Sequence, residues 1–200
     1  MFRYALGRNA RSKYVIAMLR LTLVEGLSRY ERINEAKALA TALRIMKRGY
    51  DQRKVRNLRI VAHFAKDKED FLQWLQRNTD FLHISSHGKC RRGHTVLDIT
   101  QGGKVTAEDI EDLRINAKVI FLNACQVSRE DMADAFFKAG KPRCRYYIAP
   151  QEDVPFHEAF ITALLFYKRA FLEKRPKLYS ALNYVYKLKD IKTEYWFWKP

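Results

Sequence analysis

Apolar segments alternate with amphipathic helical segments along most of this sequence, and that alternation limits the possible folds more than any other feature. The apolar runs predict strands over residues 14–23, 58–64, 80–85, 95–100, 117–122 and 145–149. Helical spacing of apolar residues predicts helices over residues 31–46, 68–77, 107–113, 129–138, 156–173 and 177–188. Strands that alternate with helices are typical of a parallel sheet with helices on both faces. We therefore predict an α/β fold, a three-layer sandwich with a mostly parallel sheet, as a single domain over residues 1–200.

Local signals support several of these boundaries. Thr106 followed by Asp109 forms a capping-box-like start for the helix over 107–113. Gly140 is expected to end the helix over 129–138. The aromatic cluster Tyr195–Trp198 predicts a short final strand or a docked tail within 189–200. The alternative is a docking surface for a partner, because exposed Trp and Tyr anchor interfaces well.

Two chemically reactive side chains follow the ends of predicted strands. His87 and Gly88 come just after the strand over 80–85, and Cys125 comes just after the strand over 117–122. In open α/β sheets, ligands bind beyond the C-terminal ends of the strands. An imidazole beside a thiol can take up its proton and later deliver a proton to a leaving amine. We therefore predict Cys125 as a nucleophile and His87 as its acid–base partner, with the backbone N–H groups of Gly88 and Cys125 as an oxyanion hole.

These motifs resemble those of a known group of proteins. His-Ile-Ser-Ser-His-Gly at 83–88 is similar to the strand and His-Gly motif of clan CD caspase-like peptidases, above all of CHAT domains. Phe-Leu-Asn-Ala-Cys-Gln at 121–126 resembles their nucleophile strand, and residues 105–110, 156–167 and 178–182 are also similar. The resemblance implies a caspase-hemoglobinase fold and a cysteine endopeptidase that uses a Cys–His dyad on a protein substrate. It implies no cofactor, and often a place in a prokaryotic defence or cell-death system.

The same resemblance suggests where a substrate side chain would bind. Metacaspases, which cleave after basic residues, carry an acidic residue two positions before the nucleophile, where this chain has Asn123. An acidic pair, Glu152 and Asp153, follows the strand over 145–149, where the family builds part of its pocket. We predict Asn123, Glu152 and Asp153 as substrate-pocket residues.

The reactive residues also have structural interpretations. Cys125 could be a core cysteine, because free cysteines are often buried. His83 is expected to be a core histidine. A zinc site is an alternative for His87, Cys90, His94 and Cys125, although residues 89–92 are expected to form a loop. Cys144 either has a low pKa beside Arg143 and Arg145 or is simply packed. We predict no metal.

Positive charge is concentrated outside the segment that carries the chemistry. The net charge is +16, and residues 1–66 contribute +12, residues 67–140 contribute −2 and residues 141–200 contribute +6. We predict a basic face that attracts an acidic protein or nucleic acid. Its expected members are Arg29, Arg32, Lys37, Arg44, Lys47, Arg48, Arg53, Lys54 and Arg56. Competing functions are therefore a catalytically silent caspase-like module that binds a partner and a basic nucleic-acid-binding domain.

Composition limits the cellular setting. No apolar run reaches the length of a membrane span, and we predict no signal peptide. Three cysteines do not suggest a disulfide framework. We expect a cytoplasmic protein.

Overall fold

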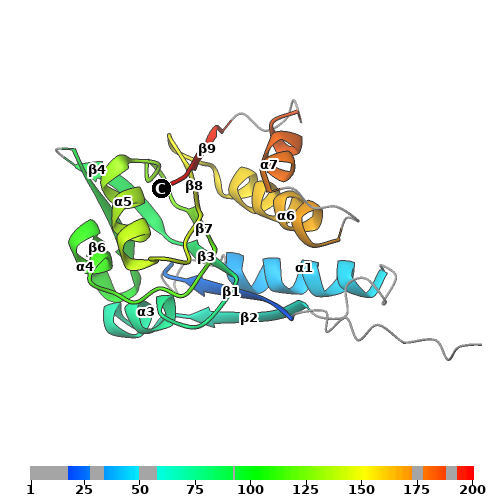
Figure 1. Ribbon diagram of the computed structural model, residues 1–200, viewed down its shortest axis with the longest axis horizontal. Helices are drawn as coiled ribbons and strands as arrows, with labels where there is room; N and C mark the ends of the chain where they lie inside the picture. The colour runs from blue at the N-terminus through cyan, green and yellow to red at the C-terminus, as the bar shows by residue number, and fades with distance from the viewer. Residues whose placement is uncertain (1–17, 28–33, 50–57, 92, 173–177, 188–192) are drawn as a thin grey trace, which may run out of the picture.

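A six-stranded sheet forms the centre of the molecule (Figure 1). The computed structural model describes residues 18–27, 34–49, 58–91, 93–172, 178–187 and 193–200. In spatial order the strands are β2 (Leu58–Phe64), β1 (Leu19–Glu25), β3 (Phe81–Ser85), β7 (Val119–Asn123), β8 (Tyr146–Pro150) and β9 (Tyr195–Trp198). The first five strands are parallel, and β9 runs antiparallel to β8.

Helices cover both faces of this sheet, which confirms the predicted three-layer α/β fold (Figure 1). One face carries α1 (Glu35–Gly49), α6 (Phe156–Leu172) and α7 (Leu178–Tyr186). The other carries α3 (Lys68–Leu75), α4 (Ala107–Glu111) and α5 (Glu130–Ala139). None of the described helices is long and apolar enough to cross a membrane.

Alternation along the strands builds a separate core on each face. Leu23 of β1 packs with Phe121 of β7 in the cluster beneath α1 and α6. The neighbouring Val24 belongs instead to the cluster beneath α3 and α5, with Ile84 of β3. Because successive strand residues point to opposite faces, buried strands with apolar residues at every position serve both cores.

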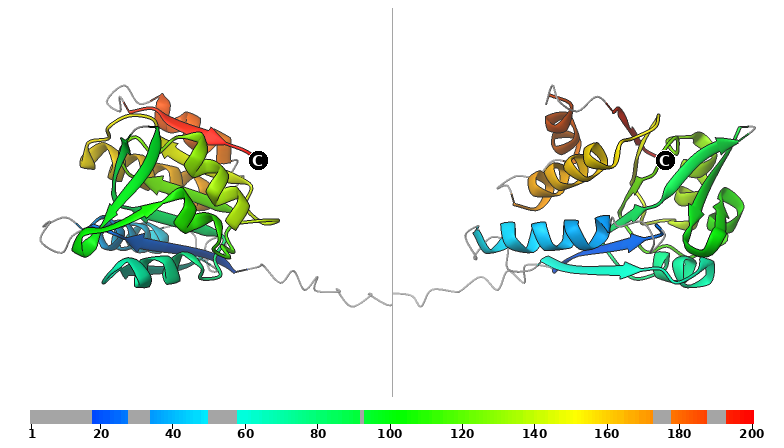
Figure 2. Two further views of the ribbon diagram at one scale, coloured as in Figure 1. Left: turned by 90° about the vertical axis from the view of Figure 1, so that its left-hand side faces the viewer. Right: turned by 180° about the vertical axis from the view of Figure 1, so that it is seen from behind.

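A second, three-stranded antiparallel sheet follows directly from β3. It contains β4 (His87–Arg91), β5 (His94–Ile99) and β6 (Gly103–Thr106), with the short 3-10 helix Thr100–Gly102 before β6. This small sheet lies on the same side of the molecule as α4 and α5 (Figure 2). The prediction of a loop over 89–92 was therefore wrong for residues 89–91, and β6 was not predicted. No residue of β4 is buried, so its sequence carries no apolar alternation.

Most other predicted elements are confirmed, with small shifts at their ends. The capping box of Thr106 and Asp109 is present, and Gly140 caps the end of α5. The start of the strand predicted over 14–23 and of the helix predicted over 31–46 lies outside the described residues. The final aromatic segment forms strand β9, as one of its two interpretations predicted.

Strand β2, which an apolar run predicted, is the edge of the sheet. Leu58 is its one buried residue. Two basic side chains of α1 bind its backbone: Arg44 donates to the carbonyl oxygen of Ile60 at 3.2 Å and Lys47 to that of Leu58 at 2.9 Å. Because these side chains occupy carbonyl oxygens of the edge strand, fewer backbone groups of β2 are free to pair with another chain.

Candidate active site

The strand register brings the predicted dyad segments to one edge of the sheet. Ser85 of β3 pairs with Asn123 of β7, and His87 and Cys125 each follow these paired residues by two positions. The backbone N–H of Ser86 donates to the carbonyl oxygen of Asn123 at 3.0 Å, so the two chains stay side by side beyond the strands. His87 is exposed and Cys125 is half-buried.

Gly88 lies directly against the segment that carries Cys125. A Cβ at this position would overlap the carbonyl oxygen of Cys125 and would lie 2.6 Å from Cγ1 of Val127 and 3.0 Å from Cβ of Ala124. Any side chain would therefore push the two segments apart. The glycine of the His-Gly motif is thus required by close approach, and it keeps the backbone of β4 in contact with the backbone after β7.

The thiol of Cys125 is protonated at neutral pH. Burial raises its pKa above the ordinary value, and the nearby carboxylate of Asp153 raises it further. The sulfur lies 3.9 Å from the carbonyl oxygen of Val154. A protonated thiol is a weak nucleophile, so chemistry at Cys125 needs a base or a change in the position of Asp153.

Gln126 connects the three segments around Cys125, and sequence reasoning did not identify it. Its backbone is left-handed, with φ of 57°. Its side-chain oxygen accepts from the backbone N–H of Cys90 at 3.1 Å, and its side-chain nitrogen donates to Asp153 at 3.0 Å. Its own N–H donates to the carbonyl oxygen of Glu152 at 3.1 Å. Nothing in the sequence marks this position, since left-handed backbone usually favours Gly or Asn.

The acidic pair predicted for the substrate pocket lies beside the segment that carries Cys125. Glu152 and Asp153 are both exposed, in the loop between β8 and α6. Their contacts with Gln126 hold this loop next to Cys125. The carboxylate of Asp153 is close enough to raise the pKa of the thiol, and the side chain of Glu152 is exposed in the same loop.

Asn123, also predicted in the pocket, lies below the surface. Its side chain is 3% exposed and fully engaged. The amide nitrogen donates to Glu35 at 2.6 Å and to the carbonyl oxygen of Ala159 at 3.1 Å, and the amide oxygen accepts from the hydroxyl of Tyr195 at 2.8 Å. These bonds fix the end of β7 to α1, α6 and β9, which is a positioning role for the residue two positions before Cys125.

Glu35 also reaches the strand that leads to His87. Its carboxylate lies 3.2 Å from Nε2 of His83, and the same ring nitrogen lies 3.1 Å from Ser85. Nδ1 of His83 lies 3.1 Å from the hydroxyl of Tyr167. His83 is fully buried, as expected of a core histidine. One buried carboxylate thus supports both strands that end at the candidate dyad.

A second buried glutamate, Glu25, lies at the end of β1. It pairs in register with Ser85, in line with Asn123. One carboxylate oxygen accepts from the N–H of Ala36 at 2.7 Å, and the other has no hydrogen-bond partner among the described residues. Burial, with the nearby Glu35 charge, raises the pKa of Glu25 to about 8. This carboxyl group is therefore largely protonated at neutral pH.

Two alternatives from the sequence can be compared with the structure. No group of three or more His, Cys, Asp or Glu side chains that could hold a metal occurs in the part of the chain that the structure describes. The low-pKa interpretation of Cys144 is wrong, because burial raises its pKa to about 11. The neighbouring Arg143 binds Asn78, Asn116 and Asp80 instead of the thiol.

The predicted basic face is only partly within the described residues. Arg29, Arg32, Arg53, Lys54 and Arg56 lie outside them. The described members all belong to α1, and two of these bind the edge of β2, as shown above.

Comparison with known families identifies the chain. A family model of the CHAT domain matches residues 12–144. The chain belongs to the CHAT domain family. The predicted resemblance is thereby confirmed, and the match includes the segments of both His87 and Cys125. No curated protein sequence matches this CHAT domain.

Solved structures of caspase-like proteins share the fold. The Drosophila initiator caspase Dronc is similar with a TM-score of 0.52 and 13% identity, over 88% of this chain and 78% of that chain. Separase in the Saccharomyces cerevisiae separase–securin complex matches with a TM-score of 0.42 and 12% identity, over 78% of this chain and 10% of that chain. At such low identity, the likeness to Dronc is evidence for the caspase-like fold alone.

Proposed function

We propose that this CHAT domain is a cysteine endopeptidase in which Cys125 is the nucleophile and His87 the acid–base residue. The observation that supports this function best is the close approach of Gly88 to the backbone of Cys125. This contact brings the His-Gly motif and the Ala-Cys motif together at the C-terminal ends of parallel strands, where α/β folds bind their ligands.

The proposed reaction begins from the neutral thiol. His87 accepts the proton of Cys125 as the sulfur attacks the scissile carbonyl carbon, and the electron pair of the C=O bond moves to oxygen. The backbone N–H groups of Gly88 and Cys125 stabilise this oxyanion. The carbonyl reforms as the C–N bond breaks, and the imidazolium gives its proton to the leaving amine. Water, deprotonated by His87, then hydrolyses the thioester and restores the thiol.

Glu152 and Asp153 are proposed to bind a basic substrate side chain next to the scissile bond. Both carboxylates are exposed beside the nucleophile segment. A bound cation would also offset the Asp153 charge that raises the pKa of Cys125. A basic substrate would therefore increase the reactivity of the thiol that attacks it. Replacing both with the isosteric amides should reduce kcat/KM for peptides with Arg or Lys, and should change it little for peptides with Leu.

A peptide-library cleavage assay tests the dyad. Cys125→Ala and His87→Ala should each abolish cleavage, while Cys90→Ser and His94→Ala serve as matched controls. Cys90 is also half-buried and His94 is also exposed, so the control substitutions should change the free energy of unfolding by similar amounts. Full activity of Cys125→Ala, or equal loss in the controls, would refute the assignment.

A catalytically silent partner-binding module is the second candidate, favoured by the raised pKa of Cys125. A peptidyl acyloxymethyl ketone probe separates the two. Covalent labelling at Cys125 that depends on His87 supports the peptidase. Absence of labelling, with alkylation of Cys125 by small reagents intact, supports the silent module.

A further inference from the structure

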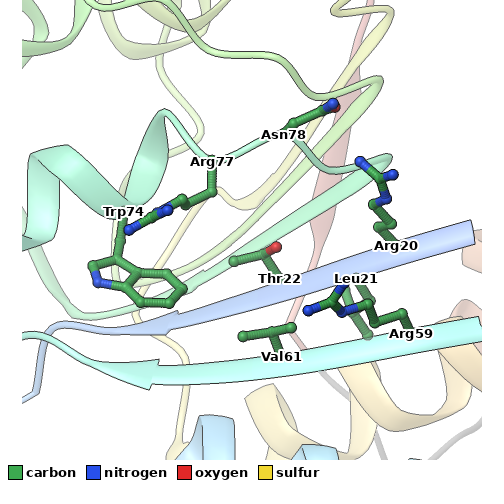
Figure 3. Close-up of a pocket in the computed structure, with 8 residues that line it drawn as sticks. All are labelled: Arg20, Leu21, Thr22, Arg59, Val61, Trp74, Arg77 and Asn78. Atoms are coloured by element: carbon green, nitrogen blue, oxygen red, sulfur yellow. The ribbon is translucent and has the colours of Figure 1, made fainter.

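A groove lined by three arginines lies where the parallel strands begin, at the opposite end of the strands from Cys125 (Figure 3). We call it the arginine groove, and its volume is about 390 Å³. Its lining residues are Arg20, Leu21, Thr22, Arg59, Val61, Trp74, Arg77 and Asn78. Arg20 and Arg59 lie near the beginning of β1 and β2, whereas Cys125 follows the end of β7. Because the strands are parallel, the groove and the candidate dyad lie at opposite ends of the strands.

The arginine groove brings like charges together. Arg20 and Arg59 are register partners on neighbouring strands, so their side chains leave the same face of the sheet. Like charges directly opposite each other on a sheet are unfavourable. Among the described residues, none of the three guanidinium groups has a carboxylate partner, and the lining contains no acidic residue.

The nearby carboxylate of Asp80 is already occupied. It pairs with Lys118 and with Arg143, each at 3.0 Å. It also accepts from the backbone N–H of Arg20 at 3.1 Å. Asp80 therefore does not neutralise the arginine side chains, and among the described residues these charges remain open to an added anion.

Trp74 holds one of these arginines in place. The guanidinium carbon of Arg77 lies over the indole ring, 4.9 Å from its centroid. His63 stacks on the same indole at 3.9 Å with an interplanar angle of 11°, and His63 in turn bonds to Asp70 at 2.7 Å. Figure 3 shows the Arg77 side chain directed toward Trp74 along one wall of the groove. The Arg77 charge is therefore preorganised, which reduces the entropy lost on binding a ligand.

The lining selects the chemistry of the ligand. All three cations are arginines, whose planar fork matches phosphate oxygens in a bidentate arrangement. A volume of about 390 Å³ is in the range of small-molecule sites. Three positive charges in so small a space suit a multiply charged phosphate better than an acidic peptide, which spreads single charges along its length. We propose that the arginine groove binds the phosphate groups of a nucleotide, a function separate from the proposed peptidase.

Binding measurements on the full chain test this site. ATP is titrated by calorimetry, and a short fluorescein-labelled oligothymidylate by anisotropy, both at low salt. Arg59→Gln/Arg77→Gln should weaken binding roughly tenfold or more. Arg91→Gln/Arg145→Gln removes the same charge from exposed positions outside the groove and outside the predicted basic face, and it should change binding little. If the double variant does not fold, Arg59→Gln alone replaces it in the assay. This variant leaves the stack of Arg77 on Trp74 intact and should still weaken binding.

Each outcome decides the proposal. Groove-dependent binding of ATP identifies a free nucleotide, and groove-dependent binding of the oligonucleotide alone identifies the phosphates of a strand. Equal loss in the Arg91→Gln/Arg145→Gln control overturns the site in favour of overall charge. Failure of both probes to bind the native chain overturns it as well. If a poly-glutamate peptide binds more tightly than ATP and the oligonucleotide, and its binding depends on the groove, the phosphate assignment is overturned in favour of an acidic protein.

Discussion

Replacement of Glu25 by glutamine should remove a large pH dependence from the stability of this CHAT domain. Glu25 is fully buried, one carboxylate oxygen has no partner among the described residues, and the pKa rises from 4.5 to about 8. Because the folded-state pKa is the higher one, folding favours the protonated form. The stabilisation is complete below about pH 4.5, decreases as the pH rises, and is lost once the pH passes about 8.

The magnitude follows from the linkage between the two pKa values. The full shift corresponds to about 5 kcal/mol, and between about pH 5.5 and pH 8 the Glu25 contribution falls by about 3 kcal/mol. Glutamine has nearly the same shape and never ionises. The free energy of unfolding of Glu25→Gln relative to the native chain should therefore increase by about 3 kcal/mol over that range.

Urea unfolding followed by circular dichroism, at several pH values across this range, measures the difference. Titrating groups that do not interact with Glu25 contribute equally to both chains and cancel in the comparison. Glu69→Gln, at an exposed position in the first turn of α3, is the matched control and should leave the pH dependence unchanged. Parallel stability curves for Glu25→Gln and the native chain would refute the reasoning, since they would mean that Glu25 ionises in the folded state as it does in water.

Two further predictions concern the candidate active site directly. Asp153→Asn removes the charge that raises the pKa of Cys125 while keeping an acceptor for Gln126. The rate at which iodoacetamide alkylates Cys125, measured by mass spectrometry at several pH values, should therefore rise at lower pH than in the native chain. An unchanged or higher alkylation midpoint would contradict this. Gly88→Ala should reduce stability by about 2 to 3 kcal/mol and abolish cleavage, because its Cβ overlaps the Cys125 carbonyl. Gly49→Ala, with open space around it, should fold at least as stably, and equal effects of both changes would refute the steric argument.

The sequence was sufficient to predict the elements whose residues carry a local pattern. Strands β3 and β7 are buried at every position because both of their faces are covered, and the reactive residues follow them closely. The capping box and the glycine at the end of α5 are equally local signals. Strand β4 gave no such signal: His87–Arg91 is held by pairing with β5, and none of its residues is buried.

The role of Asn123 could not be predicted because its partners are far away in the sequence. Glu35 lies 88 residues before it and Tyr195 lies 72 residues after it. Sequence comparison with metacaspases places the residue at this position in a substrate pocket, but here the side chain meets buried partners first. The arginine groove was missed for the same reason, since Arg20, Arg59 and Arg77 come together only when β1, β2 and α3 are packed.

Strand β9 is hydrogen-bonded to the candidate active site, although it is the last element that the structure describes. Tyr195 binds Asn123, two residues before Cys125, and the indole N–H of Trp198 donates to Ser128, three residues after it, at 2.8 Å. The backbone carbonyl of Glu194 accepts from the N–H of Gln151, at the start of the acidic loop, at 3.1 Å. The strand thus holds both sides of the Cys125 segment and the loop whose charge raises the pKa of the thiol. Because β9 is an edge strand, a chain that paired with it or displaced it would disturb the Cys125 segment through these bonds.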